Sequence, residues 1–147
     1  MLSNFSKFEL ALNGKPAFPE PDVMHPQLMI LMELARQKLG YPIDIHCSYD
    51  TKGHAISSRH YDGKAIDCSS EVDYKKLALT FKEVADYMEL KIGLGLYPFW
   101  NNKGVHIDVR PEAERTSYWV RDHDEVYLYR CDFDTIIEMA KNLEVVA

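Results

Sequence analysis

The 147-residue chain contains only three cysteines, too few and too widely spaced for a disulfide framework or a cysteine-based zinc knot. We therefore expect Cys47, Cys68 and Cys131 to be free, buried thiols. Long apolar runs are also missing. The stretch over residues 28–35 is interrupted by Glu33 and falls short of the roughly 20 residues that a membrane span needs. The sequence thus predicts a protein without a membrane span.

Runs of like charge are missing as well. The chain has 23 acidic and 17 basic residues, a net charge of −6, and no basic arm or acidic tail. Nucleic acid is therefore not expected as a partner. The first residues lack the basic segment and apolar segment of a secretory signal, which predicts cytoplasmic synthesis without a signal peptide. We expect a monomer.

The chain, 46% hydrophobic, is long enough for one core, so residues 1–147 are expected to form a single domain. Residues 1–24, which include a proline-rich piece, are expected to form an irregular arm. Apolar spacing predicts helices over residues 25–39, 71–89 and 133–143, the second opened by a capping box that starts at Ser70. Strand patterns cover residues 42–48, 64–68, 91–97, 104–109, 117–121 and 125–130. These elements predict an α+β fold with a central antiparallel sheet, its last four strands forming a meander, and flanking helices.

Two short runs carry metal-ligating residue types. His60 opens a run that ends at Asp67, and about 40 residues later His106 and Asp108 share one face of an expected strand. Two imidazoles and one carboxylate can hold a catalytic zinc ion with one position open to water. Each residue alone has an ordinary explanation, since Asp67 could cap a turn and a strand histidine is commonly just hydrogen-bonded. The combination predicts a zinc site.

Residues 58–67, Ser-Arg-His-Tyr-Asp-Gly-Lys-Ala-Ile-Asp, resemble a known signature, Ser-x-His-x-x-Gly-x-Ala-x-Asp. That signature belongs to the zinc D-alanyl-D-alanine carboxypeptidases and phage L-alanyl-D-glutamate endopeptidases, which are related to lysostaphin and the hedgehog signalling domain. Residues 93–98 and 105–110 extend the resemblance, which covers roughly residues 5–121. It implies a hedgehog/D-Ala-D-Ala-peptidase-like fold and a zinc ion bound by His60, Asp67 and His106. It also implies hydrolysis of peptidoglycan stem peptides by metal-activated water.

The sequence departs from this family at residues 47–50, where relatives commonly have Ser-Gly-Tyr-Arg and this chain has Cys-Ser-Tyr-Asp. Asp50 thus replaces an arginine that is expected to bind a substrate carboxylate or carbonyl. Arg59 or Arg110 can supply the missing positive charge, because a guanidinium binds a carboxylate through two hydrogen bonds. Either can equally be a surface ion-pair residue. The candidate substrate-binding residues are therefore Ser58, Arg59, Tyr97 and Arg110.

A general base is also missing from its usual place, since residues 102–104 are Asn, Lys and Gly. Asp108 is the candidate catalytic residue, because it lies two positions after His106 on the same strand face. Its alternative role is to orient a ligand histidine. His46 and His54 are expected in structural or solvent-facing roles. The aromatic side chains of Tyr97 and residues 118–119 could complete the core, although Tyr97 could instead form a substrate wall.

Three functions remain open from the sequence. The first is a zinc metallopeptidase, such as a phage or prophage lysis protein that acts on the cell wall after release. The second is a zinc-containing module that binds the cell wall or a protein but has little or no catalytic activity. The third is a structural domain whose histidines and aspartates are surface polar groups. Zinc content separates the third from the first two.

Overall fold

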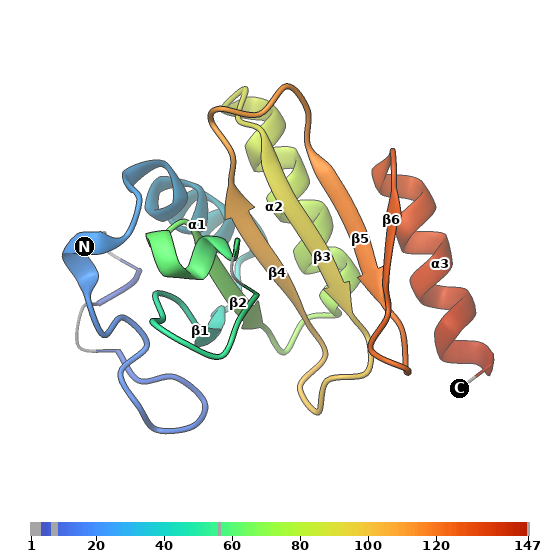
Figure 1. The fold of residues 1–147 in the computed structure, drawn as a ribbon, viewed down its shortest axis with the longest axis horizontal. Coiled ribbons are helices and arrows are strands. Elements are labelled where there is room, and N and C mark those ends of the chain that lie inside the picture. The colour runs from blue at the N-terminus through green and yellow to red at the C-terminus, as the bar shows by residue number, and fades with distance from the viewer. Residues whose placement is uncertain (1–3, 7–8, 56, 147) are drawn as a thin grey trace.

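The computed structural model describes residues 4–6, 9–55 and 57–146, and its centre is a six-stranded sheet with the order β1-β2-β4-β3-β5-β6 (Figure 1). The strands are β1 Asp44–Cys47, β2 Ala65–Ser69, β3 Ile92–Tyr97, β4 Gly104–Val109, β5 Ser117–Arg121 and β6 Tyr127–Arg130. The helices are α1 Pro26–Leu39, α2 Tyr74–Tyr87 and α3 Phe133–Val146, with the 3-10 turns η1 Pro21–Val23 and η2 Arg59–Asp62. The predicted α+β class is confirmed.

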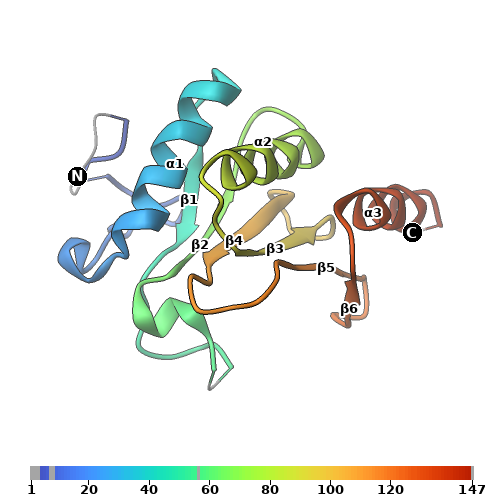
Figure 2. The ribbon, with the colours of Figure 1, turned by 90° about the horizontal axis from the view of Figure 1, so that it is seen from above.

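The three helices cover one face of the sheet, whereas η2 and the loop before it lie on the other face (Figure 2). The main core fills the space between α1, α2 and the sheet. All six residues of β3 are buried, as expected for a strand with neighbours on both sides and a helix against one face. Because the helices all lie on one face, the opposite face of the sheet is left for polar side chains.

The ends of the helices follow from local sequence. Pro26 occupies the first turn of α1, the His25 side chain accepts a hydrogen bond from the backbone of Gln27, and Gly40 ends the helix at φ 77°. The expected capping box at Ser70 is wrong. The cap of α2 is Asp73, whose carboxylate accepts from the backbone N–H of Lys75, so the helix begins three residues later than predicted.

The predicted meander is wrong in one pairing. β3 and β4 form an antiparallel hairpin, but β5 pairs with β3 rather than with β4, and the β3–β5 pair is parallel. The remaining strand pairs are antiparallel. Residues 110–116 therefore lead the chain past the end of β3. Strand periodicity fixes which residues alternate but not which neighbour a strand selects, and this is why the sequence missed the pairing.

One row of residues crosses the whole sheet at a single level. The strand registers place neighbours opposite one another in the order Cys47, Asp67, His106, Gly95, Trp119 and Tyr129. Residues paired in this way point to the same face. Gly95 makes the row possible, because a Cβ at this position would overlap the Trp119 indole. Gly93, one row away, leaves the corresponding space to the side chains of Asp108 and Arg110.

Among residues 4–6 and 9–24, the structure has η1 and a bridge between Leu10 and Pro16, and Phe5 and Phe18 are fully buried in edge-to-face contact. The expected burial of the cysteines needs correction. The three cysteines are free, as predicted, yet only Cys68 is buried, whereas Cys47 is half-buried and Cys131 is exposed.

Within the described part of the chain, none of the helices combines the length and the apolar character needed to cross a bilayer.

The fit of Trp119 against Gly95 gives a first prediction. Gly95→Ala should lower the free energy of unfolding by about 1–3 kcal/mol, because the added methyl group displaces the indole or strains the β3–β5 pair. Urea unfolding followed by tryptophan fluorescence measures this effect. Tyr87→Ala is the control, since Tyr87 is 83% exposed and its loss should change stability by no more than about 0.5 kcal/mol. Equal stability of both variants would contradict the packing argument.

Candidate metal centre

Three elements bring together the predicted zinc ligands. His60 lies on η2. Ser58 caps the start of this turn, since its hydroxyl accepts from the His60 backbone N–H, and Gly63 caps its end with φ 67°. Asp67 lies on β2, directly opposite His106 on β4. The η2 turn folds the His60 ring back over the sheet so that it meets Asp67, as the sequence had indicated.

The spacing of the donor atoms fits a tetrahedral metal. His60 Nε2 lies 3.3 Å from Asp67 Oδ2, and His106 Nδ1 lies 3.0 Å from Asp67 Oδ1. Ligands bound to zinc at about 2.0–2.1 Å are separated by about 3.3 Å when the geometry is tetrahedral. The two imidazole rings stand nearly perpendicular, at 78°. The donor set and its spacing therefore suit a zinc ion with a further position left for another ligand.

Each histidine is fixed through the nitrogen that the metal would not use. His60 Nδ1 donates to the backbone carbonyl of Ser48 at 2.6 Å, and His106 Nε2 donates to Asp108 Oδ2 at 2.7 Å. A carbonyl and a carboxylate can only accept, so when a metal is bound these contacts would keep the ring protons on His60 Nδ1 and His106 Nε2. Metal-binding histidines are commonly held in this way. The arrangement leaves His60 Nε2 and His106 Nδ1 facing the shared Asp67.

Asp108 lies behind His106 rather than in the open cleft. Its carboxylate is only 1% exposed and also receives two hydrogen bonds from Arg110, at 2.7 Å and 3.1 Å. Arg59 Nε lies 3.7 Å away. Of the two roles open to Asp108, these contacts favour the one in which the carboxylate orients the His106 ring.

In the metal-free cluster, the surroundings favour protonated imidazoles and ionised carboxylates. Burial disfavours the charged form of His60, but the contacts with Asp67 and Cys47 outweigh it and raise its pKa to about 10. For His106, burial is likewise outweighed by Asp108 and Asp67, and the pKa rises to about 9. Although burial opposes ionisation of the two carboxyl groups, their hydrogen bonds to the imidazoles hold the pKa of each well below its usual value.

A cleft of about 610 Å³ opens above this cluster. Its described lining includes all four candidate substrate-binding residues, Ser58, Arg59, Tyr97 and Arg110, together with His60, Asp67 and His106. Within the described chain, Asp67 is the one carboxylate on this lining. The face that the helices leave uncovered thus forms a hollow with the three metal-ligating groups in its wall.

Both candidate arginines already donate hydrogen bonds to carboxylates within the protein. Arg59 donates to Glu112 at 2.7 Å, which matches the surface ion-pair alternative, and Arg110 holds Asp108. Tyr97 combines both of its expected roles: it is 7% exposed, it stacks on Trp100 at 4.1 Å, and it still borders the cleft. Burial raises the pKa of its hydroxyl, which accepts a hydrogen bond from Trp119 at 3.2 Å.

Sequence reasoning missed the wall of the cleft that β5 and β6 supply. Trp119 was expected in the core, and although only 4% exposed it borders the cleft and packs against the His106 ring at 5.2 Å. Arg121, Tyr127 and Tyr129 complete this wall. Arg121 Nε is buried and finds no hydrogen-bond partner among the described residues, while its Nη2 lies 3.3 Å from Glu125 Oε2. Alternation along residues 117–121 already indicates that Trp119 and Arg121 share a face.

Comparison with known proteins does not assign the chain to a family. No protein-family model and no curated protein matches the sequence. Among solved structures, the chain is similar to the L-Ala D-Glu endopeptidase ChiX of Serratia marcescens, with 16% sequence identity and a TM-score of 0.48. The alignment covers 60% of this chain and 82% of that chain. Membership of the peptidase family therefore stays a prediction.

The position of Asp108 leads to a second prediction. Asp108→Asn should weaken zinc binding by about 10–100-fold, because an amide offers one acceptor oxygen where His106 and Arg110 now use two. Isothermal titration calorimetry measures the affinity, and Asp124→Asn, at an exposed site, is the matched control. Unchanged affinity together with lost hydrolysis would instead assign Asp108 the role of a base.

The raised histidine pKa values lead to a third prediction. His60 and His106 are protonated in the metal-free protein below about pH 9, so zinc binding at pH 7 should release about two protons. Affinity should rise with pH until both groups have titrated, and then level off. Calorimetry at pH 7 in buffers with different ionisation enthalpies counts the protons. Release of none would mean that the imidazoles are already neutral.

Proposed function

We propose that the protein is a zinc-dependent peptidase that hydrolyses peptidoglycan stem peptides, as a D-Ala-D-Ala carboxypeptidase or a related cell-wall endopeptidase. The observation that carries the proposal is the convergence of His60, Asp67 and His106 at tetrahedral spacing in the wall of a cleft. The signature over residues 58–67 supplies the substrate class. Ordinary polar surface residues would not be expected to have such spacing together with a backbone carbonyl behind the His60 ring and a carboxylate behind the His106 ring.

A zinc ion bound here supplies Lewis-acid chemistry, which activates water and polarises a peptide carbonyl. The chain provides the geometry for that chemistry. Ser48 and Asp108 keep the two imidazoles in the required tautomers and orientations. Asp67 supplies the single negative charge of the ligand set, so the loaded site keeps a net positive charge that favours electron-rich carbonyl groups.

The walls of the cleft supply the means to hold a peptide. We propose that Ser58, Arg59, Tyr97 and Arg110 contribute to substrate binding, and we add Arg121. Arg59, Arg110 and Arg121 are each paired with a carboxylate, so all three would act mainly through their positive charge. The carboxylates and carbonyls of a stem peptide match this positive, aromatic wall.

A second candidate function is a zinc-containing module that binds the cell wall or a protein with little or no catalysis. The burial of Asp108 favours it, because a carboxylate that is 1% exposed and fully hydrogen-bonded is poorly placed to move protons. We further propose that the chain acts as a monomer and as one domain spanning residues 1–147, with residues 1–24 as its irregular arm.

Activity and metal content test the proposal together. The purified protein should contain zinc and release D-alanine or cleaved stem peptides from peptidoglycan, as identified by mass spectrometry. His106→Ala should abolish zinc binding at this centre and reduce hydrolysis at least 100-fold, whereas the exposed His123→Ala should change neither. Zinc with tight binding of cell-wall fragments but no turnover would select the binding module. A protein with neither zinc nor hydrolysis, even after zinc is added, would refute both functions.

A further inference from the structure

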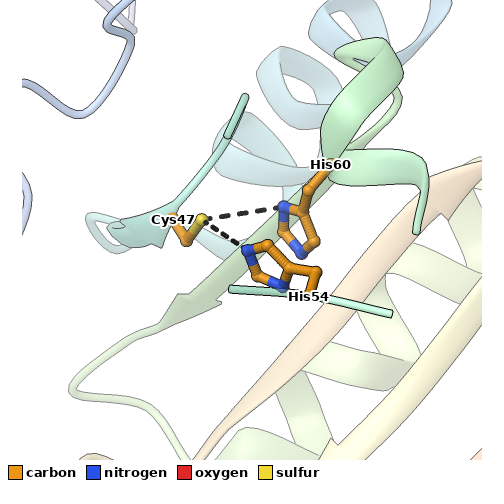
Figure 3. A group of neighbouring side chains, drawn as sticks. All are labelled: Cys47, His54 and His60. Carbon is orange, nitrogen blue, oxygen red and sulfur yellow. Dashed lines mark hydrogen bonds between the residues drawn. The ribbon is translucent and has the colours of Figure 1, made fainter. Parts of the chain in front are cut away.

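We propose that Cys47, Asp50 and His54 form a second metal site, distinct from the first and suited to zinc through its thiolate. Cys47 and His54 lie beside His60, the histidine of the first centre, with Cys47 at the end of β1 and His54 on the loop that follows it (Figure 3). The Asp50 carboxylate, on the same loop, lies 3.3 Å from His54 Nε2. Two of the three residues, Cys47 and Asp50, belong to the segment where the chain departs from the signature of the peptidase family. The proposal does not depend on hydrolysis at the first centre.

The donor spacings match zinc coordination. Cys47 Sγ lies 3.6 Å from His54 Nε2, which in turn lies 3.3 Å from Asp50 Oδ2, and the sulfur and carboxylate are 3.9 Å apart. Bond lengths of about 2.3 Å to sulfur and 2.0–2.1 Å to nitrogen or oxygen give tetrahedral separations of about 3.6 Å and 3.3 Å. The sulfur–nitrogen and nitrogen–oxygen distances agree with these values. The sulfur–carboxylate distance is slightly longer, and a small rotation of the half-exposed Asp50 side chain would shorten it.

The three donors are already oriented. Cys47 stands opposite Asp67 in the sheet, so its side chain projects to the same face as the first centre. Asp50 Oδ1 accepts the backbone N–H of Thr51, and Oδ2 is the oxygen that faces His54. The backbone N–H and carbonyl of His54 both bond to the Tyr61 hydroxyl, at 2.9 Å and 2.7 Å. Little further ordering is needed for metal binding.

His60 separates the two sites. Its ring stacks on that of His54 with centroids 4.3 Å apart, and its Nδ1 is 3.8 Å from Cys47 Sγ but keeps the shorter bond to Ser48. We therefore assign the second site three protein ligands, with His60 serving the first centre. One thiolate and one carboxylate balance the two charges of zinc, so a neutral second site can exist next to a charged first one.

Metal in the second site would link the end of β1 to the loop that leads into η2. His54 lines the cleft, as do Ser58 and His60 further along the same segment. A bound ion would therefore fix one wall of the cleft.

Cobalt titration of the full chain tests the second site separately from the first, because a cobalt–thiolate bond absorbs in the near ultraviolet and cobalt bound to imidazole and carboxylate does not. We expect two equivalents of cobalt per chain, with a thiolate band from one of them. Cys47→Ser and His54→Ala should each lose the band and one equivalent. Cys131→Ser, which removes an exposed thiol, is the matched control and should keep both.

His106→Ala should show the opposite pattern, with the thiolate band kept and the other equivalent lost. This separates the two proposals, since the first centre can fail while the band persists. Absence of a thiolate band in the unmodified protein would overturn the second site. So would a band that survives Cys47→Ser with the fold intact by circular dichroism.

Discussion

The row of side chains from Cys47 to Tyr129 depends on one residue that has no side chain, Gly95. Because β3 has no side chain at this level, the Trp119 indole can extend over it and pack against His106, which has Asp67 on its other side. A candidate metal ligand, its carboxylate partner and an aromatic wall are thereby set at one level of the sheet. Sites built on strands hold their geometry more closely than sites built on loops.

The buried charged groups around Asp67 and His106 depend on one another for stability. Two carboxylates, two imidazoles and the Arg110 guanidinium lie largely out of water, where each charge requires a partner. Asp67 is shared by both histidines, and Asp108 by His106 and Arg110. The raised pKa values of the imidazoles mean that their protons would balance these carboxylates in the metal-free protein. Binding of a divalent cation would then exchange one set of positive charges for another within a fixed framework, with little new desolvation.

The sequence sufficed for most of the elements, and the three residues that it proposed for the first centre do lie together. The helices were predicted to within a few residues, but the β2–β4 pair that sets Asp67 opposite His106 was not, because the expected meander placed β4 between β3 and β5. The contribution of Trp119 and Arg121 was missed, since it depends on β5 pairing parallel with β3. Partners that lie far apart in the chain, such as Glu112 for Arg59, leave no periodic signal.

The parallel β3–β5 pair also divides the molecule in chain order. All three candidate donors of the first centre come from η2, β2 and β4, which precede β5 in the sequence. β5, β6 and α3 follow as a terminal unit that packs mainly on itself and on β3. The groups that could hold an ion therefore belong to one part of the chain, and the cleft wall formed by Trp119 and Tyr129 belongs to another.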